Sequence, residues 1–221
     1  MKKTITLLLA MSMLLGASAL AVSREDAQSA AQARVGAGAT LVESDRDDGY
    51  YEFEFSDDAA RYDVLVDEQS GEVVMQSIEH RGMRKASSAA VDEAAARQAV
   101  TEAAPEAQIH YALLEQDDGA YEWNLFYTDG EDAVIASVQA ESGEIRQYEI
   151  YYGAAAEILT ADQAVEALTA SRGTMEILEL DLDLDEDTGT LRYDGNARVD
   201  GRVYEFEMTA AHGDIVKWER D

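Results

Sequence analysis

Apolar and polar residues alternate through most of the chain, as they do in strands that have one buried face and one solvent-exposed face. In one stretch, Tyr51, Phe53 and Phe55 alternate with Glu52 and Glu54. The same pattern predicts strands at residues 39–43, 50–55, 61–67, 72–78, 108–115, 121–128, 133–139, 144–151, 175–184, 191–199, 202–208 and 214–218. Asp-Gly or Thr-Gly pairs between the first two strands of each group of four predict hairpin turns.

Three alanine-rich stretches without this alternation are predicted to be helices, one before each group of four strands. Each begins with an apolar residue that is followed by a capping residue, namely Ser23, Asp92 or Thr160. Such side chains accept hydrogen bonds from the unpaired N–H groups of a first helical turn. Thr160 and Gln163 together form a capping box. The small alanine side chains allow each helix to approach a sheet closely.

The predicted elements recur with a single period. A strand residue precedes a turn glycine by nine positions in three places, which are Tyr62 and Gly71, Val134 and Gly143, and Tyr204 and Gly213. These glycines are 72 and 70 residues apart, and the three capping residues of the helices are 69 and 68 residues apart. Because two independent signals give the same period, the chain contains an internal repeat.

We therefore predict an α+β fold of three tandem units, each an N-terminal helix packed on a four-stranded antiparallel meander sheet whose other face is acidic and wet. The units span residues 22–80, 91–152 and 159–221, and they are joined by a basic linker at 81–90 and a short linker at 153–158. The basic linker is either a solvated connector or a segment that binds an acidic face of a neighbouring unit.

Residues 1–21 have the layout of a secretory signal peptide. Lys2 and Lys3 precede an apolar run at 5–15, and small residues at 17–21 offer a cleavage site after Ala21. The competing interpretation is an uncleaved membrane anchor, which the small residues disfavour. We therefore predict a secreted or extracytoplasmic protein of the cell envelope, with no stable membrane insertion after signal cleavage.

The charge balance excludes several classes of partner. Acidic residues outnumber basic ones by 46 to 17, and the net charge is −29. Such a surface repels nucleic acid and anionic lipid, so neither is predicted as a partner. The hydrophobic content of 47% argues against general disorder. The chain has no cysteine, so an exported form must be stabilised by its core alone.

The sequence predicts no catalytic residues and no cofactor. There are three histidines and no His-Glu-x-x-His spacing, which argues against a zinc site of the usual kind. There is also no Gly-x-Ser-x-Gly segment of the type that carries a serine nucleophile. An enzyme that uses carboxylates alone is the least favoured hypothesis, because charges at alternate strand positions are typical of a solvated face.

One acidic run offers weak calcium candidates. Its carboxylates are Asp181, Asp183, Asp185 and Asp187. The run resembles the start of an EF-hand loop, but Glu186 stands where a glycine is needed and Arg192 where the bidentate Glu belongs. A strand with leucines inward and acids outward is the simpler interpretation. The alternative function that follows from the run is an acidic, calcium-responsive envelope protein.

A unit that runs from a helix through hairpins and a Tyr-Glu-Phe strand to a Gly-Glu/Asp-Ile/Val turn resembles the PepSY domain. The third copy carries this pattern most fully, at 203–207 and 213–216. The first copy keeps it at 62–64 and 70–73. The second keeps Ser142-Gly143-Glu144-Ile145 but has Val134 in place of the aromatic residue.

The resemblance implies a secreted or cell-surface module that is not an enzyme and that binds and restrains peptidases. It therefore implies a protein partner for this chain, with a secreted peptidase as the candidate.

Overall fold

The computed structural model describes residues 21–117, 119–186 and 188–220. The predicted signal peptide, apart from Ala21, and the calcium candidate Asp187 lie outside the described residues.

The described residues form three α-helices, one short 3-10 helix and twelve strands. The first group is α1 (Arg24–Val35), β1 (Thr40–Asp47), β2 (Tyr50–Ser56), β3 (Ala60–Asp67) and β4 (Val73–His80). The second group is α2 (Glu93–Ala103), β5 (Gln108–Asp117), β6 (Ala120–Asp129), β7 (Asp132–Gln139) and β8 (Ile145–Tyr151). After the 3-10 helix η1 (Ala154–Ala156) come α3 (Ala161–Arg172), β9 (Glu176–Asp185), β10 (Thr190–Val199), β11 (Arg202–Thr209) and β12 (Ile215–Arg220).

The helices begin where the capping residues predict. The backbone N–H of Asp26 donates to Ser23 Oγ over 3.1 Å, and that of Ala95 donates to Asp92 Oδ1 over 2.9 Å. In α3 the backbone N–H of Thr160 donates to Gln163 Oε1 over 3.0 Å, which is one half of the capping box.

Replacing Asp92 with alanine removes the acceptor at the start of α2, and it is expected to lower the free energy of unfolding by about 1 kcal/mol. The melting temperature should fall by about 2–4 °C for a domain of this size. Asp92→Asn keeps an acceptor oxygen at the same position and serves as the control, and thermal unfolding by circular dichroism measures both. Equal losses for the two variants would contradict the capping role.

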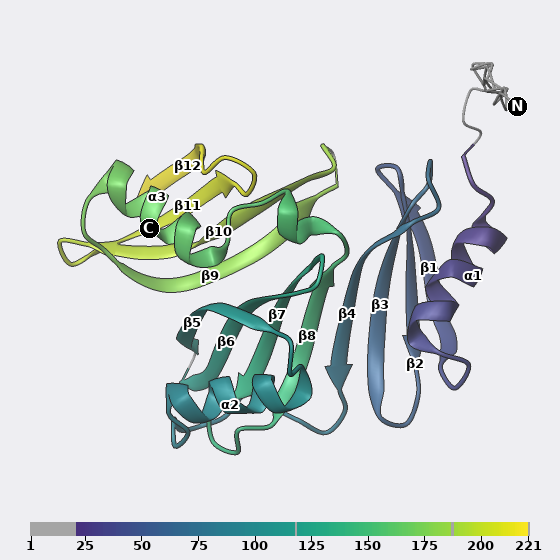
Figure 1. Cartoon of the computed structure of the whole chain (residues 1–221), viewed down its shortest axis with the longest axis horizontal. Helices are drawn as coiled ribbons and strands as arrows, with labels where there is room; N and C mark the ends of the chain where they lie inside the picture. Colours follow the sequence, from purple (N-terminus) through teal and green to yellow (C-terminus); the bar gives the residue numbers. More distant parts are fainter. Residues whose placement is uncertain (1–20, 118, 187, 221) are drawn as a thin grey trace, which may run out of the picture.

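The strands form two antiparallel sheets, a large one of eight strands and a small one of four (Figure 1). The large sheet has the order β1-β2-β3-β4-β8-β7-β6-β5, because β4 pairs with β8 between Met75–Tyr151 and Glu79–Gln147. The small sheet has the order β12-β11-β10-β9. The α+β class is as predicted, but a separate sheet for each of three units is wrong. An unpaired strand edge favours pairing with another edge, and the local pattern does not indicate which two edges meet.

Helices α1 and α2 cover the same face of the large sheet. Val64, which packs with α1, lies opposite Gln76, and Gln76 lies opposite Ile150, which packs with α2. Residues directly opposite one another share a face. The other face of the large sheet is called the helix-free face below.

The small sheet covers part of this helix-free face. Phe126, Ile135 and Tyr151 of the large sheet belong to one buried cluster with Leu180 and Leu182 of β9. The predicted wet face is therefore buried over β6–β8, which corrects the sequence analysis. Figure 1 shows the small sheet beside the β5–β8 half and away from β1 and β2.

Within the described residues, no helix combines the length and the apolar character that are needed to span a membrane.

Candidate functional site

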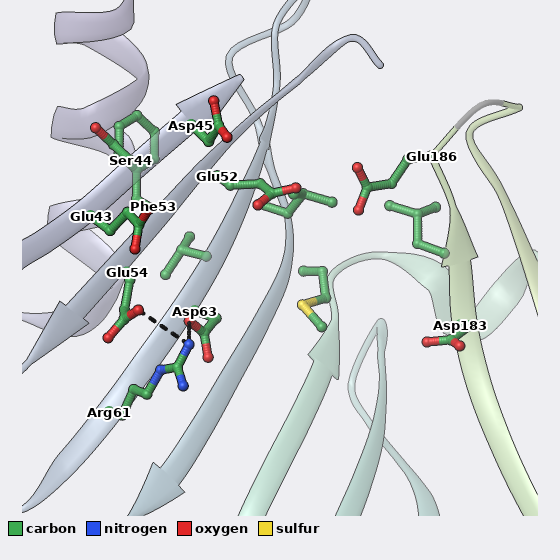
Figure 2. A pocket seen from close by; sticks show the side chains of 14 residues that line it. Glu43, Ser44, Asp45, Glu52, Phe53, Glu54, Arg61, Asp63, Asp183 and Glu186 are labelled. Carbon is green, nitrogen blue, oxygen red and sulfur yellow. Dashed lines mark hydrogen bonds and ion pairs between the residues drawn. The ribbon is translucent and has the colours of Figure 1, made fainter. Parts of the chain in front are cut away.

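A groove lies between the helix-free face of β1–β4 and the end of the β9–β10 hairpin (Figure 2). Its volume is about 390 Å³. Its carboxylates are Glu43, Asp45, Glu52, Glu54, Asp63, Asp183 and Glu186. Apolar side chains, Leu65, Met75 and Leu184, line it between these acids. We call this feature the acidic groove.

Strand periodicity places the acids of β2 in the groove. Tyr51, Phe53 and Phe55 turn toward α1 and are buried, so Glu52 and Glu54 between them must point to the opposite face. The register of β2 with β3 then sets Glu54 opposite Asp63 and Glu52 opposite Leu65. Three carboxylates and one apolar side chain are thus brought together by pairing alone.

The groove is strongly negative. Arg61 is the one basic residue among the side chains that line it, and it lies 3.2 Å from Glu54 Oε2 and 3.1 Å from Asp63 Oδ1. Seven carboxylates and one guanidinium leave a formal charge of −6. Burial raises the pKa of Asp63 above its ordinary value, and Arg61 offsets part of this effect. Figure 2 shows Glu186 and Asp183 on the wall opposite Glu52.

A second group of carboxyls lies where the edge of β9 meets the large sheet. The N–H of Leu180 donates to Glu115 Oε1 over 3.3 Å, and the hydroxyl of Tyr151 donates to the carbonyl oxygen of Leu182. Side chains of β5 and β8 therefore bond backbone groups at the outer edge of β9. We call this contact the β9 seam.

Acidic side chains crowd one flank of the β9 seam. Asp181 lies directly opposite Asp194 in the β9–β10 register, and Oδ1 of Asp194 is buried without a hydrogen-bond partner among the described residues. Burial and neighbouring carboxylates raise the pKa of Asp181 to about 8 and that of Asp194 to about 6. Burial also raises the pKa of Glu115 to about 7 and shifts that of Glu149 upward.

The calcium candidates that the structure describes lie along one face of β9 and have different neighbours. Asp181 lies at the β9 seam, Asp183 lines the acidic groove, and Asp185 forms an ion pair with Arg192. Leu180 and Leu182 are buried on the other face of β9, as the strand interpretation predicts. Within the described ranges, no three His, Asp or Glu side chains are arranged to hold a metal ion. The calcium site stays a prediction, because Asp187 lies outside those ranges.

Part of the basic linker at 81–90 is bonded to strands of the large sheet. Arg81 donates to Ser56 Oγ, and Ala86 forms an isolated antiparallel bridge with Tyr121. Lys85 is close enough to Glu115 to lower the pKa of that carboxyl. Whether the linker as a whole is a solvated connector or a segment that binds an acidic face of a neighbouring unit stays a prediction.

Sequence reasoning missed the acidic groove as a site, although it described the acids of β2 as solvent-facing. The alternation at 51–55 indicates their face, but the wall formed by Asp183 and Glu186 comes from a segment more than a hundred residues away. A signal for the buried helix-free face was present in the run Leu125-Phe126-Tyr127, where alternation stops. Consecutive apolar residues are typical of strands that are buried on both faces.

One family model matches the first part of the chain. Residues 21–74 match the PepSY family, described as "Peptidase propeptide and YPEB domain". This match runs from the residue before the predicted first unit to the first residues of β4. No curated protein matches the chain.

Several solved structures are similar to this chain at low identity. The YpeB C-terminal domain of Bacillus megaterium is 14% identical, with 90% of this chain and 98% of that one covered and a TM-score of 0.36. A putative lipoprotein from Clostridium difficile is 18% identical, with 63% and 97% covered and a TM-score of 0.33. A BLIP-like protein from Bacteroides fragilis is 17% identical, with 55% and 81% covered and a TM-score of 0.26. TM-scores of this size carry no conclusion about function.

Proposed function

We propose that this chain is an exported, non-enzymatic protein-binding module of the PepSY type, which restrains a secreted or envelope peptidase. In this proposal the segments 22–80, 91–152 and 159–221 are three PepSY-like repeats. The PepSY match at 21–74 supports the type of module. The repeated order of one helix followed by four strands supports the extension to the later segments.

One observation carries the proposal of protein binding, namely the unequal cover of the helix-free face. The β6–β8 part of this face is buried under the small sheet, whereas the β1–β4 part forms the open wall of the acidic groove. A sheet face that keeps the partly exposed apolar residue Met75 beside a hollow is suited to a macromolecular partner. The strong negative charge disfavours nucleic acid and anionic lipid as that partner.

The test is a pull-down with residues 22–221 as bait against the secreted and envelope proteins of the producing cell, followed by a peptidase assay on what binds. We expect capture of a specific extracytoplasmic peptidase whose activity falls as the chain is added. A captured peptidase that keeps its full activity would remove restraint from the proposal and leave binding.

The calcium-responsive alternative is tested separately by calorimetric titration of the same chain. Heat of binding and a higher melting temperature with calcium, together with no captured protein, would favour that alternative over a binding module.

A further inference from the structure

The walls of the acidic groove come from two different sheets. Glu52 and Glu54 belong to β2 of the large sheet, whereas Asp183 belongs to β9 and Glu186 follows it in the hairpin (Figure 2). Because these elements face each other across a hollow of about 390 Å³, the groove admits a few side chains and excludes a folded domain. Its shape fits an extended segment of polypeptide.

The lining distinguishes between classes of segment. Leu65, Met75 and Leu184 offer apolar contact between the two acidic walls. The aliphatic stem of an arginine or lysine packs on such residues while its charged end stays among the carboxylates. An anionic segment would meet a formal charge of −6, which disfavours it at every point of the groove.

The one cation in the lining is already engaged. Arg61 contacts both Glu54 and Asp63, so it neutralises part of the charge on this wall of the groove. Glu52 and Asp183 are exposed on opposite walls, and they are the carboxylates that an entering cation meets. The partly buried Asp63 has a raised pKa because burial removes its hydration. A second cation, supplied by a bound partner, would favour the ionised form of Asp63.

We propose that the acidic groove binds an extended segment of a partner protein in which arginine or lysine side chains alternate with apolar ones. The inference rests on the proposed protein-binding role and adds the chemistry of the partner. Alternate side chains of an extended segment point in opposite directions. The arginine or lysine side chains therefore share one face of the segment. With this face turned into the groove, their aliphatic stems pack on Met75 and Leu184 and their charged ends reach the carboxylates of the two walls, while the apolar side chains lie on the opposite face. Arginine is preferred to lysine, because its planar fork pairs with carboxylates through two hydrogen bonds.

The probe is a fluorescently labelled ten-residue peptide in which arginine alternates with valine, titrated with residues 22–221 at 0.05 M and 0.15 M salt. We expect saturable binding that weakens at the higher salt concentration. The same peptide with glutamate in place of arginine is expected not to bind. Replacing arginine with lysine should weaken binding by a few fold.

A matched pair of variants separates the groove from general charge attraction. Glu52→Gln with Asp183→Asn removes one carboxylate from each wall, and we expect affinity to fall about tenfold. Glu72→Gln with Asp200→Asn makes the same change of net charge at exposed turns outside the groove, and it should leave affinity within twofold. Asparagine at position 200 suits the positive φ of 49° found there. Unchanged far-ultraviolet circular dichroism shows that both variants fold.

Three results would overturn this inference. Equal affinities of the two double variants would mean diffuse attraction to an acidic surface. Binding of calcium at the groove without binding of the arginine peptide would assign the carboxylates to a metal ion. Self-association that the groove variant abolishes would make a second copy of this chain the occupant.

The peptide titration and the pull-down fail independently. Absence of peptide binding beside a captured peptidase removes the cationic segment and leaves the proposed function. Peptide binding without any captured peptidase keeps the cationic segment as the ligand of the groove and removes the restraint of a peptidase.

Discussion

Replacing Arg146 with methionine is expected to lower the free energy of unfolding by about 3–5 kcal/mol, the cost of leaving a buried charge without its partner. Arg146 Nε and Nη2 donate to the two carboxylate oxygens of Glu122 over 2.6 Å and 2.9 Å. Glu122 is 4% exposed, so water cannot replace the lost guanidinium. Arg146 Nη1 also lies 3.1 Å from Glu79 Oε1, so the same side chain links β8 to β4.

Two further variants identify the cause of the loss at Arg146. Arg146→Met combined with Glu122→Leu removes both charges and should recover most of the stability. Arg198→Met breaks an ion pair of 2.6 Å with Glu176 whose side chains are 44% and 62% exposed, so it should cost under about 1 kcal/mol. Urea unfolding measures all three. A similar cost for Arg146→Met and Arg198→Met would contradict a buried pair.

The second large effect is a loss of stability as the pH rises from 5 to 7. Burial and repulsion between carboxylates raise the pKa of Asp181 to about 8 and that of Glu115 to about 7 in the folded chain. Their ordinary values are near 4. The folded state therefore holds protons that the unfolded state has released. The contribution of these two protonated carboxyls to the free energy of unfolding is complete below pH 4, and it is lost as the pH rises through 7 and 8.

The size of this loss follows from the number of protons. Each proton held only by the folded state changes the free energy of unfolding by about 1.4 kcal/mol per pH unit. Two such groups give an upper limit of roughly 5 kcal/mol between pH 5 and pH 7. We expect about 2–3 kcal/mol, because the carboxyls titrate as a coupled set and solvent screens part of their repulsion. The melting temperature should fall by about 5–10 °C.

Variants at the β9 seam provide the control for the pH series. Asp181→Asn with Glu115→Gln fixes both groups in a neutral form, and it should flatten the dependence of melting temperature on pH. Asp200→Asn, in the exposed turn between β10 and β11, should leave the slope unchanged. If the wild-type melting temperature is flat between pH 5 and pH 7, or if the double variant keeps the full slope, the seam does not hold these protons.

The sequence predicted the local elements because their signals are local. Ser23, Asp92 and Thr160 lie at the starts of the helices, and the alternation at 51–55 identifies both the buried aromatics and the acidic face of β2. The glutamates of the acidic groove were therefore placed on the correct side of the sheet, although not recognised as part of a site.

The long-range arrangement was not predictable by the same means. Before they pair, β4 and β8 are the edge strands of their hairpin sets and have unpaired backbone groups. No side-chain pattern in the sequence specifies which edge each of them pairs with. Glu122 and Arg146 occupy positions that alternation assigns to solvent, yet both are buried, and the pairing of β4 with β8 brings Glu79 beside Arg146. Charged residue types do not reveal this burial, because the same glutamate and arginine can form a buried ion pair in one fold and stay solvated in another.

The joining of β4 to β8 sets the order in which the chain can fold. Ser77 and Glu149 face each other across this joint although 72 positions separate them in the chain. The hairpins on either side close over short distances and form early, whereas contacts between distant segments form slowly. Synthesis delivers β4 well before β8. We therefore expect the pairing of β4 with β8, after the β1–β4 and β5–β8 hairpins have formed, to be the slowest step of folding. The edge of β4 stays unpaired until β8 has been synthesised and has folded.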